Sequence, residues 1–275
     1  MTITDLATTY CNRVGGSPGY LEQLTVLTKR LTWKAADLSP DLIDGYLTKA
    51  LHSLSPSTVA NHRRMLWTLL RFAASERLVD ASIVRPPRRV KRPPPAPRAW
   101  SHAEIIHLLD ACKRLPGGKK CKHAVLMRAW VLVAYSTGLR LCDLLAIRHD
   151  QLRGQRILVR QHKTGSPHVV YVDDNAMRAI KELPVRGPRI FGDLICRDKL
   201  LAQMRRLVKL AGLPGSTKFL RRSGATYCEI VGRDATGHLG HKTATMKQHY
   251  VDRLLLAEER GAGPSAPPLP LERVG

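Results

Sequence analysis

A stretch rich in proline and arginine, residues 85–98, limits what this chain can fold into. Proline has no backbone N–H and its ring blocks the preceding turn, so neither a helix nor a central strand runs through such a stretch. Segments of this composition are extended and semi-rigid. We therefore interpret residues 85–98 as a linker. It divides the 275-residue chain into an N-terminal domain at residues 1–84 and a second domain at residues 99–258.

The N-terminal domain contains three Ser-Pro pairs, at residues 17–18, 39–40 and 55–56. Serine is a favoured helix cap, and proline is tolerated at the first helical position. After each pair, apolar residues recur at spacings of three and four, which is the period of a helix with one buried face. The sequence predicts a helical domain whose first helix begins at residue 17.

The charge of the chain points to a polyanionic partner. It has 45 Lys+Arg against 22 Asp+Glu, a formal net charge of +23. Such an excess repels itself unless it meets a polyanion, and nucleic acid is the usual one. A basic rim on the third predicted helix and the basic linker are candidate phosphate contacts, although a solvated helix face and a plain spacer explain them as well. The candidate DNA-binding residues are His62, Arg63, Arg64, Arg88, Arg89, Lys91 and Arg92.

Other classes of function are disfavoured by the sequence. It has no apolar run long enough to span a bilayer and no signal segment at its start, so we expect a cytoplasmic protein associated with the nucleoid and no membrane partner. The 6 cysteines form no CxxC pair, and the spacing of Cys112, Cys121 and His123 fits no common zinc site. We expect no metal, no cofactor and no small-molecule substrate.

The second domain is predicted to be mainly helical with one β-hairpin, an α+β fold. Ser101 and Glu104 have the spacing of a capping box at the start of its first helix. Two β-branched runs, residues 156–159 and 168–172, flank a turn-rich connector. The remaining predicted helices span residues 121–137, 139–145, 174–183, 197–211, 218–232, 234–239 and 243–258, and residues 259–275 form a flexible Pro-rich tail without periodicity.

Six residues of this domain can carry chemistry: Arg140, Lys163, Lys218, Arg221, His241 and Tyr250. Taken singly, each has an ordinary explanation. Arg140 can pair with Asp143 one helical turn away, and a lone tyrosine more often packs than reacts.

Taken together, the six residues fit an in-line attack on a phosphodiester. Arginine holds the non-bridging oxygens with several donors in fixed geometry. Lys163, at the hairpin tip, can give a proton to the leaving 5′ oxygen. The phenol of Tyr250, with an ordinary pKa of about 10, then needs a base and a positive field to attack. The chain has no compact carboxylate cluster for Mg²⁺, which argues against a two-metal nuclease.

These residues occur in short motifs with a recognisable order. The stretch Thr137-Gly138-Leu139-Arg140-Leu141-Cys142-Asp143-Leu144 resembles the first arginine box of the tyrosine recombinases, the phage integrase family. Lys163 resembles the hairpin lysine of that family. Lys218-Phe219-Leu220-Arg221 resembles its His-x-x-Arg box, and Leu239-Gly240-His241 with Tyr250 resembles its Leu-Gly-His…Tyr box.

The resemblance implies a site-specific DNA recombinase that cleaves and rejoins strands through a 3′-phosphotyrosyl intermediate. It implies a helical, SAM-like core-binding domain and a catalytic domain that form a C-shaped clamp on DNA, with Asp143 in a supporting role. The implied partner is double-stranded DNA with inverted-repeat core sites. The implied assembly is a homotetramer on DNA, formed from a monomer or weak dimer, that exchanges strands through a Holliday junction without any cofactor.

One position departs from the family pattern, because Lys218 stands where the His-x-x-Arg box usually has histidine. Lysine keeps the charge but is a poor proton acceptor near neutral pH. We therefore expect His241, rather than Lys218, to take the phenol proton, with solvent as the other acceptor. Two alternatives stay open: a type IB topoisomerase with similar chemistry, and a DNA-binding relative that does not cleave.

Overall fold

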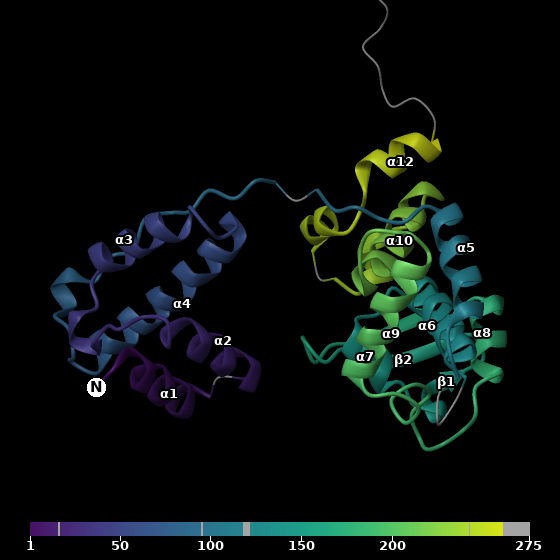
Figure 1. Ribbon diagram of the computed structural model, residues 1–275, viewed down its shortest axis with the longest axis horizontal. Coiled ribbons are helices and arrows are strands. Elements are labelled where there is room, and N and C mark those ends of the chain that lie inside the picture. The colour runs from purple at the N-terminus through teal and green to yellow at the C-terminus, as the bar shows by residue number, and fades with distance from the viewer. Residues whose placement is uncertain (16, 95, 118–121, 242, 261–275) are drawn as a thin grey trace, which may run out of the picture. The chain divides into compact units, whose positions relative to one another are not determined.

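The chain folds into two compact units, Met1–Pro94 and Pro95–Gly275 (Figure 1). The computed structural model describes residues 1–15, 17–94, 96–117, 122–241 and 243–260. Each unit has a hydrophobic core of its own. The fold is mainly helical with one small antiparallel sheet, which confirms the predicted fold class. Within the described residues, no helix is both long and apolar enough to cross a membrane.

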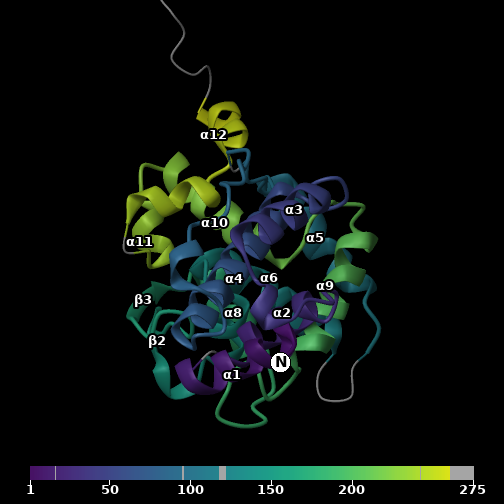
Figure 2. The ribbon, with the colours of Figure 1, turned by 90° about the vertical axis from the view of Figure 1, so that its left-hand side faces the viewer.

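The described residues of the first unit form four α-helices, of which α1 packs on α2 and α4 while α3 packs on α4 (Figures 1 and 2). Ser17, Ser39 and Ser55 each accept a backbone hydrogen bond at a helix N-terminus, as predicted. The bounds are α1 Ile3–Val14, α2 Pro18–Thr28, α3 Pro40–Ala50 and α4 Pro56–Ser75, with 3₁₀ turns at Ala35–Asp37 and Ala81–Ile83.

Helix α1 corrects the prediction that the first helix begins at residue 17. A capping box starts it, because Thr2 accepts from the Asp5 backbone N–H while the Asp5 carboxylate accepts from the Thr2 N–H. The Thr2-x-x-Asp5 spacing was the local signal for this helix. Its polar composition made the apolar face, including Ile3 and Leu6, difficult to recognise in the sequence.

The Pro-rich stretch is partly packed onto the first unit. Nε of Arg63 donates to the carbonyls of Pro87 at 2.9 Å and Arg88 at 2.7 Å. The Arg88 N–H donates to the Asp44 carboxylate at 2.7 Å, and Val90 is buried in the core. Residues 85–90 are therefore held along the surface of α3 and α4, by hydrogen bonds that a free spacer lacks.

The second unit surrounds α6, which is apolar on most of its surface and packs against α8, α9 and α10. Trp130 at its centre is 1% exposed. The α-helices are α5 His102–Ala111, α6 His123–Thr137, α7 Leu141–Ala146, α8 Asp174–Lys181, α9 Arg197–Leu210, α10 Thr217–Ile230, α11 Ala235–Leu239 and α12 Arg253–Arg260, with 3₁₀ turns at Cys112–Arg114, His149–Gln151 and Ala244–His249.

The sheet is antiparallel in the order β1-β2-β3, with bounds β1 Leu152–Arg153, β2 Arg156–Arg160 and β3 Pro167–Tyr171. The predicted hairpin is β2 and β3, paired so that Leu158 lies opposite Val169. Ile157, Val159 and Val170 are buried, whereas Leu158 and Val169 between them are exposed. The hairpin therefore has one face on the core, and residues 162–165 of its connector are exposed.

The helix predicted at residues 243–258 is wrong as a single element. A 3₁₀ turn covers Ala244–His249, Tyr250 follows it, and α12 begins at Arg253. Asp252 causes the break, because its carboxylate accepts the backbone N–H of Leu254 and Leu255 and so caps α12. Residues 259 and 260, predicted as tail, belong to α12. The prediction for 261–275 lies outside the described residues.

Candidate active site

Arg140 is placed by the end of α6. Gly138 closes that helix in the left-handed conformation, with φ of +59°, and Arg140 becomes the N-cap of α7. Nη1 of Arg140 donates to Oε1 of Gln161 at 3.0 Å and lies 4.0 Å from Oδ2 of Asp143. The predicted pair with Asp143 is thus long. The nearly buried Asp143 carboxylate instead accepts the backbone N–H of His162 at 2.8 Å, which ties α7 to the hairpin connector.

Arg221 lies on α10 and is only 6% exposed. Its guanidinium donates to the carbonyl of Gly138 and, at 3.0 Å, to that of Leu239. Burial, with a further contribution from the positive charge of Arg140, lowers the pKa of Arg221 to about 10. The side chain therefore stays protonated at neutral pH and connects the end of α6 to the end of α11.

The two lysines are solvent-exposed. Lys163 lies in the connector between β2 and β3, and Lys218 lies on α10 one turn before Arg221. Both line a cleft of about 770 Å³ that is also lined by Arg140, Arg221 and Tyr250. The structure thus brings five of the six candidate side chains, which come from four separate segments, to one cleft of the second unit.

Tyr250 is half-buried at the end of the last 3₁₀ turn. Its ring centroid lies 4.9 Å from that of His241 and 5.0 Å from Cζ of Arg221. Nε2 of His241 is 3.1 Å from Nη2 of Arg221. Because a guanidinium can only donate, Nε2 is the acceptor and the proton of the neutral ring is on Nδ1.

His241 is a weak base in this setting. Burial first, and then the charges of Arg221, Arg140 and Lys163, lower its pKa to about 4. The ring is therefore neutral near pH 7, with its Nε2 lone pair already engaged by Arg221. This arrangement disfavours the expectation that His241 takes the phenol proton.

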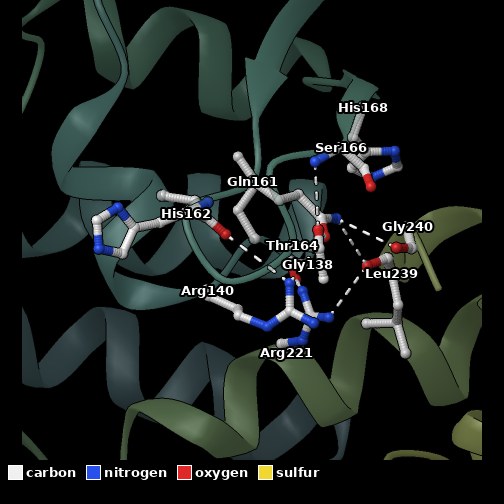
Figure 3. A network of polar contacts seen from close by, with 12 residues as sticks. Gly138, Arg140, Gln161, His162, Thr164, Ser166, His168, Arg221, Leu239 and Gly240 are labelled. Atoms are coloured by element: carbon white, nitrogen blue, oxygen red, sulfur yellow. Dashed lines mark hydrogen bonds and ion pairs between the residues drawn. The ribbon is translucent and has the colours of Figure 1, made fainter. Parts of the chain in front are cut away.

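Gln161 and His238 are site residues that sequence reasoning missed. Gln161 is 1% exposed and hydrogen-bonds across three segments of the site (Figure 3). The sequence contained a signal for Gln161, because this residue continues the alternation of inward-facing residues, Ile157 and Val159, along β2.

The His238 imidazole lies against Gly138, where a Cβ added to the glycine would come within 2.5 Å of Nε2 of His238. Burial, first among the causes, lowers its pKa to about 4.

Three candidate DNA-binding residues of α4 are engaged within the protein. Nδ1 of His62 is 2.8 Å from the Tyr46 hydroxyl, and burial lowers the pKa of His62. Arg63 holds the carbonyls of residues 87 and 88, and Cζ of Arg64 lies 5.4 Å from the Tyr20 ring centroid. The linker residues Arg88, Arg89, Lys91 and Arg92 are exposed. DNA contact by this set stays a prediction.

Among the described residues, no group of three or more His, Cys, Asp or Glu side chains is arranged so that it could hold a metal ion. Cys121, named above with Cys112 and His123, lies outside the described residues.

A comparison of the sequence with known proteins identifies its family. A sequence model of the phage integrase family matches residues 99–254. Tyrosine recombinase XerD of Mycobacterium leprae (strain TN) is 28% identical over 212 residues, which cover 66% of this chain and 65% of the relative. The alignment thus spans just under two thirds of that relative's length.

Solved structures share the fold. A lambda integrase dimer bound to a COC' core site superposes with a TM-score of 0.74 at 18% identity, covering 98% of this chain and 100% of that one. A lambda integrase tetramer bound to a Holliday junction gives 0.71 at 18% identity, covering 89% and 79%. The Tn1549 transposon integrase with circular intermediate DNA gives 0.65 at 16% identity, covering 91% and 95%. Because the family model spans more than half of the sequence, the chain belongs to the phage integrase family, the tyrosine recombinases.

Proposed function

We propose that this chain is a site-specific DNA recombinase that cleaves and rejoins strands through a 3′-phosphotyrosyl intermediate, with Tyr250 as the nucleophile. The observation that carries the proposal is the single cleft lined by Arg140, Arg221, Lys163, Lys218 and Tyr250. Two guanidinium groups and two ammonium groups around one phenol make a site for a phosphodiester. Family membership supports the same reaction.

In the proposed reaction the phenol oxygen of Tyr250 attacks the phosphorus in line with the 5′ oxygen. A bond from phosphorus to the tyrosine oxygen forms, and the bond to the 5′ oxygen breaks. Lys163 gives a proton to that oxygen, which leaves as a free hydroxyl. The reverse attack by a 5′ hydroxyl of another strand rejoins the DNA and frees the tyrosine. The number of phosphodiester bonds is conserved, so no energy donor is needed.

The surrounding groups act by charge and position. Arg140 and Arg221 hold the non-bridging oxygens and stabilise the charge of the pentavalent transition state. Lys218 supplies a further positive charge at the mouth of the cleft. His241 accepts a hydrogen bond from Arg221 and so helps to hold it in place. Its ring is neutral at pH 7 because its pKa is about 4. The phenol proton then passes to solvent, which reaches the open cleft.

The partner in this proposal is double-stranded DNA with inverted-repeat core sites, which the protein meets at the nucleoid in the cytoplasm. The excess of positive charge, +23, supports a polyanionic partner. We propose that four copies assemble on DNA, by analogy with the lambda integrase tetramer bound to a Holliday junction. Strand exchange between two sites requires four tyrosines, one for each strand that is cut.

A covalent adduct tests the proposal. Purified protein is incubated with a pool of nicked duplexes of randomised sequence, in which cleavage beside the nick releases a short strand and traps the enzyme. We expect a protein–DNA band that survives denaturation in the wild type and is lost in Tyr250→Phe. The matched control is Tyr171→Phe, because Tyr171 is an exposed tyrosine of β3 that does not line the cleft. Binding without an adduct in the wild type would contradict the proposal and favour a non-cleaving relative.

A further inference from the structure

Gln161 stands out as a buried polar side chain at the base of an exposed connector. It is 1% exposed, whereas residues 162–165 directly after it are exposed. Its own backbone closes the connector, because its N–H donates to the Ser166 carbonyl at 2.9 Å and its carbonyl accepts from Gly165 at 2.8 Å. A buried amide costs free energy unless its donors and acceptors are paired, so the partners of this side chain show what it holds.

The Gln161 amide joins three segments of the site (Figure 3). Its Oε1 accepts from Nη1 of Arg140 at 3.0 Å and from the Thr164 hydroxyl at 3.1 Å. Its Nε2 donates to the carbonyls of Leu239 at 3.4 Å and Gly240 at 3.3 Å. The amide orientation is fixed by its partners, since an arginine only donates and a carbonyl only accepts.

These partners either belong to the proposed reaction, as Arg140 does, or lie close in sequence to a residue of the site. The connector that Gln161 closes carries Lys163, and the Leu239–Gly240 turn directly precedes His241. In the described residues both polar contacts of the Arg140 side chain use Nη1, so the other guanidinium nitrogens stay available to a phosphate. Gly240 has φ of +62°, and a Cβ there would overlap the amide nitrogen of Gln161. The amide therefore fits closely against the turn as well as hydrogen-bonding to it.

We propose that Gln161 is a positioning residue that fixes Arg140, the connector bearing Lys163 and the turn before His241 relative to one another. It touches none of the reacting atoms, so it acts through these three partners. An amide suits this task because it accepts from the arginine and donates to the carbonyls at the same time. A carboxylate lacks the donor, and an apolar side chain lacks both. This inference rests on the proposed function for its effect on rate, but not for its effect on local order.

The test compares Gln161→Met, which keeps the volume and loses the hydrogen bonds, with the wild type. We expect the cleavage rate constant at saturating protein to fall by about 10- to 100-fold, because small misplacements of reacting groups have effects of that size. The protein concentration that gives half the maximal rate should stay unchanged. An unchanged rate constant, or a change confined to the half-saturating concentration, would overturn the inference.

A second measurement is independent of activity. Hydrogen exchange of the backbone should become faster at residues 162–166 and 239–241 in Gln161→Met and stay unchanged in the first unit. If that variant does not fold, Gln161→Glu provides the same comparison, because it keeps the shape and loses the donor to the two carbonyls. Unchanged exchange in both segments would overturn the inference even if the wild type never cleaved DNA. A wild type without adduct would contradict only the proposed function.

The matched control is Gln155→Met, in the turn between β1 and β2 of the same sheet. Gln155 is exposed, and its side chain donates to the carboxylate of Asp174 on α8, away from the cleft. The control loses a hydrogen bond between the sheet and a helix, but none to the site. It should leave both the rate constant and the exchange at residues 239–241 at wild-type values. A loss equal to that of Gln161→Met would show a general weakening of the sheet and overturn the inference.

Discussion

Arg140 and Arg221 bring two guanidinium groups to the same cleft but are held in different ways. Arg221 is almost fully buried and satisfies the carbonyls of Gly138 and Leu239, whereas the Arg140 side chain is 23% exposed and contacts side chains. Arg221 therefore has a structural as well as a proposed catalytic role, whereas the role of Arg140 is mainly the catalytic one.

This difference predicts how two alanine variants behave. Both Arg140→Ala and Arg221→Ala should lower the cleavage rate by about 100-fold or more, as the loss of transition-state donors does. Only Arg221→Ala should also lower the free energy of unfolding clearly, by about 1–3 kcal/mol. The variant removes the guanidinium that donates to the Gly138 carbonyl and leaves the Leu239 carbonyl with Gln161 as its remaining side-chain donor. Single-turnover cleavage and urea denaturation measure the two effects.

Duplex binding serves as the control for both variants. Non-specific affinity is spread over many Lys and Arg contacts, so a gel-shift assay should show little change with either substitution. A collapse of binding with Arg140→Ala would contradict a role confined to the chemistry.

Lys163 gives a second prediction for a single residue. If it protonates the leaving 5′ oxygen, a substrate with sulfur at that position should restore cleavage by Lys163→Ala, because a thiolate leaves without a proton. The comparison is the ratio of cleavage rates on the sulfur and oxygen substrates, with Lys218→Ala as the matched lysine of the same cleft. Equal ratios in the wild type and Lys163→Ala would argue against lysine as the acid.

At the scale of elements, the α6–α7 junction decides where Arg140 lies. Gly138 ends α6 with positive φ and leaves room for the His238 imidazole of α11. A larger residue at position 138 would be strained by the positive φ, and its Cβ would overlap the His238 imidazole. The glycine thus joins helix termination to the packing of α11 against α6.

Alanine substitution of two glycines separates these costs. Gly154→Ala introduces only the strain, since its φ is +58° and nothing lies within 4 Å of the added Cβ. It should cost about 1–2 kcal/mol of unfolding free energy. Gly138→Ala should cost more, and the excess should disappear in the Gly138→Ala, His238→Ala double variant compared with His238→Ala. Equal losses for both glycines would show that the imidazole contact is unimportant.

Local signals predicted most elements, and the exceptions have physical reasons. The Ser-Pro pairs predicted α2, α3 and α4 because caps act within one turn. The helix predicted over residues 243–258 is broken because Asp252 also accepts the backbone N–H of Ala99, a contact made only after folding. The motifs named the six candidate side chains, but not the pKa of His241, which depends on the burial of that ring against Arg221. Gln161 continues the inward face of β2 but lies in no recognisable motif, and three of its four side-chain partners, Arg140, Leu239 and Gly240, are distant in sequence.

At the scale of the whole molecule, the Pro-rich stretch separates the two units, and Arg63 holds its first part. By donating to the carbonyls of Pro87 and Arg88, this arginine shortens the length of chain that is free between the units. Val90 adds an apolar anchor in the first core.

Limited trypsin digestion tests the role of Arg63. Arg63→Ala should speed cleavage after Arg88 and Arg89 several-fold, because local release of a segment controls its proteolysis. The neighbouring Arg64→Ala is the matched control, since Arg64 lies over the Tyr20 ring and does not hold the linker. Equal cleavage rates in the two variants would contradict an anchored linker.

The central claim is that Tyr250 forms the bond to DNA. Mass spectrometry of the trapped adduct, after digestion with trypsin and nuclease, identifies the modified residue directly. We predict a peptide containing Tyr250 that carries a nucleotide linked through its 3′ phosphate, with a free 5′ hydroxyl on the released strand. A nucleotide on any other residue, or a linkage through a 5′ phosphate, would contradict the account.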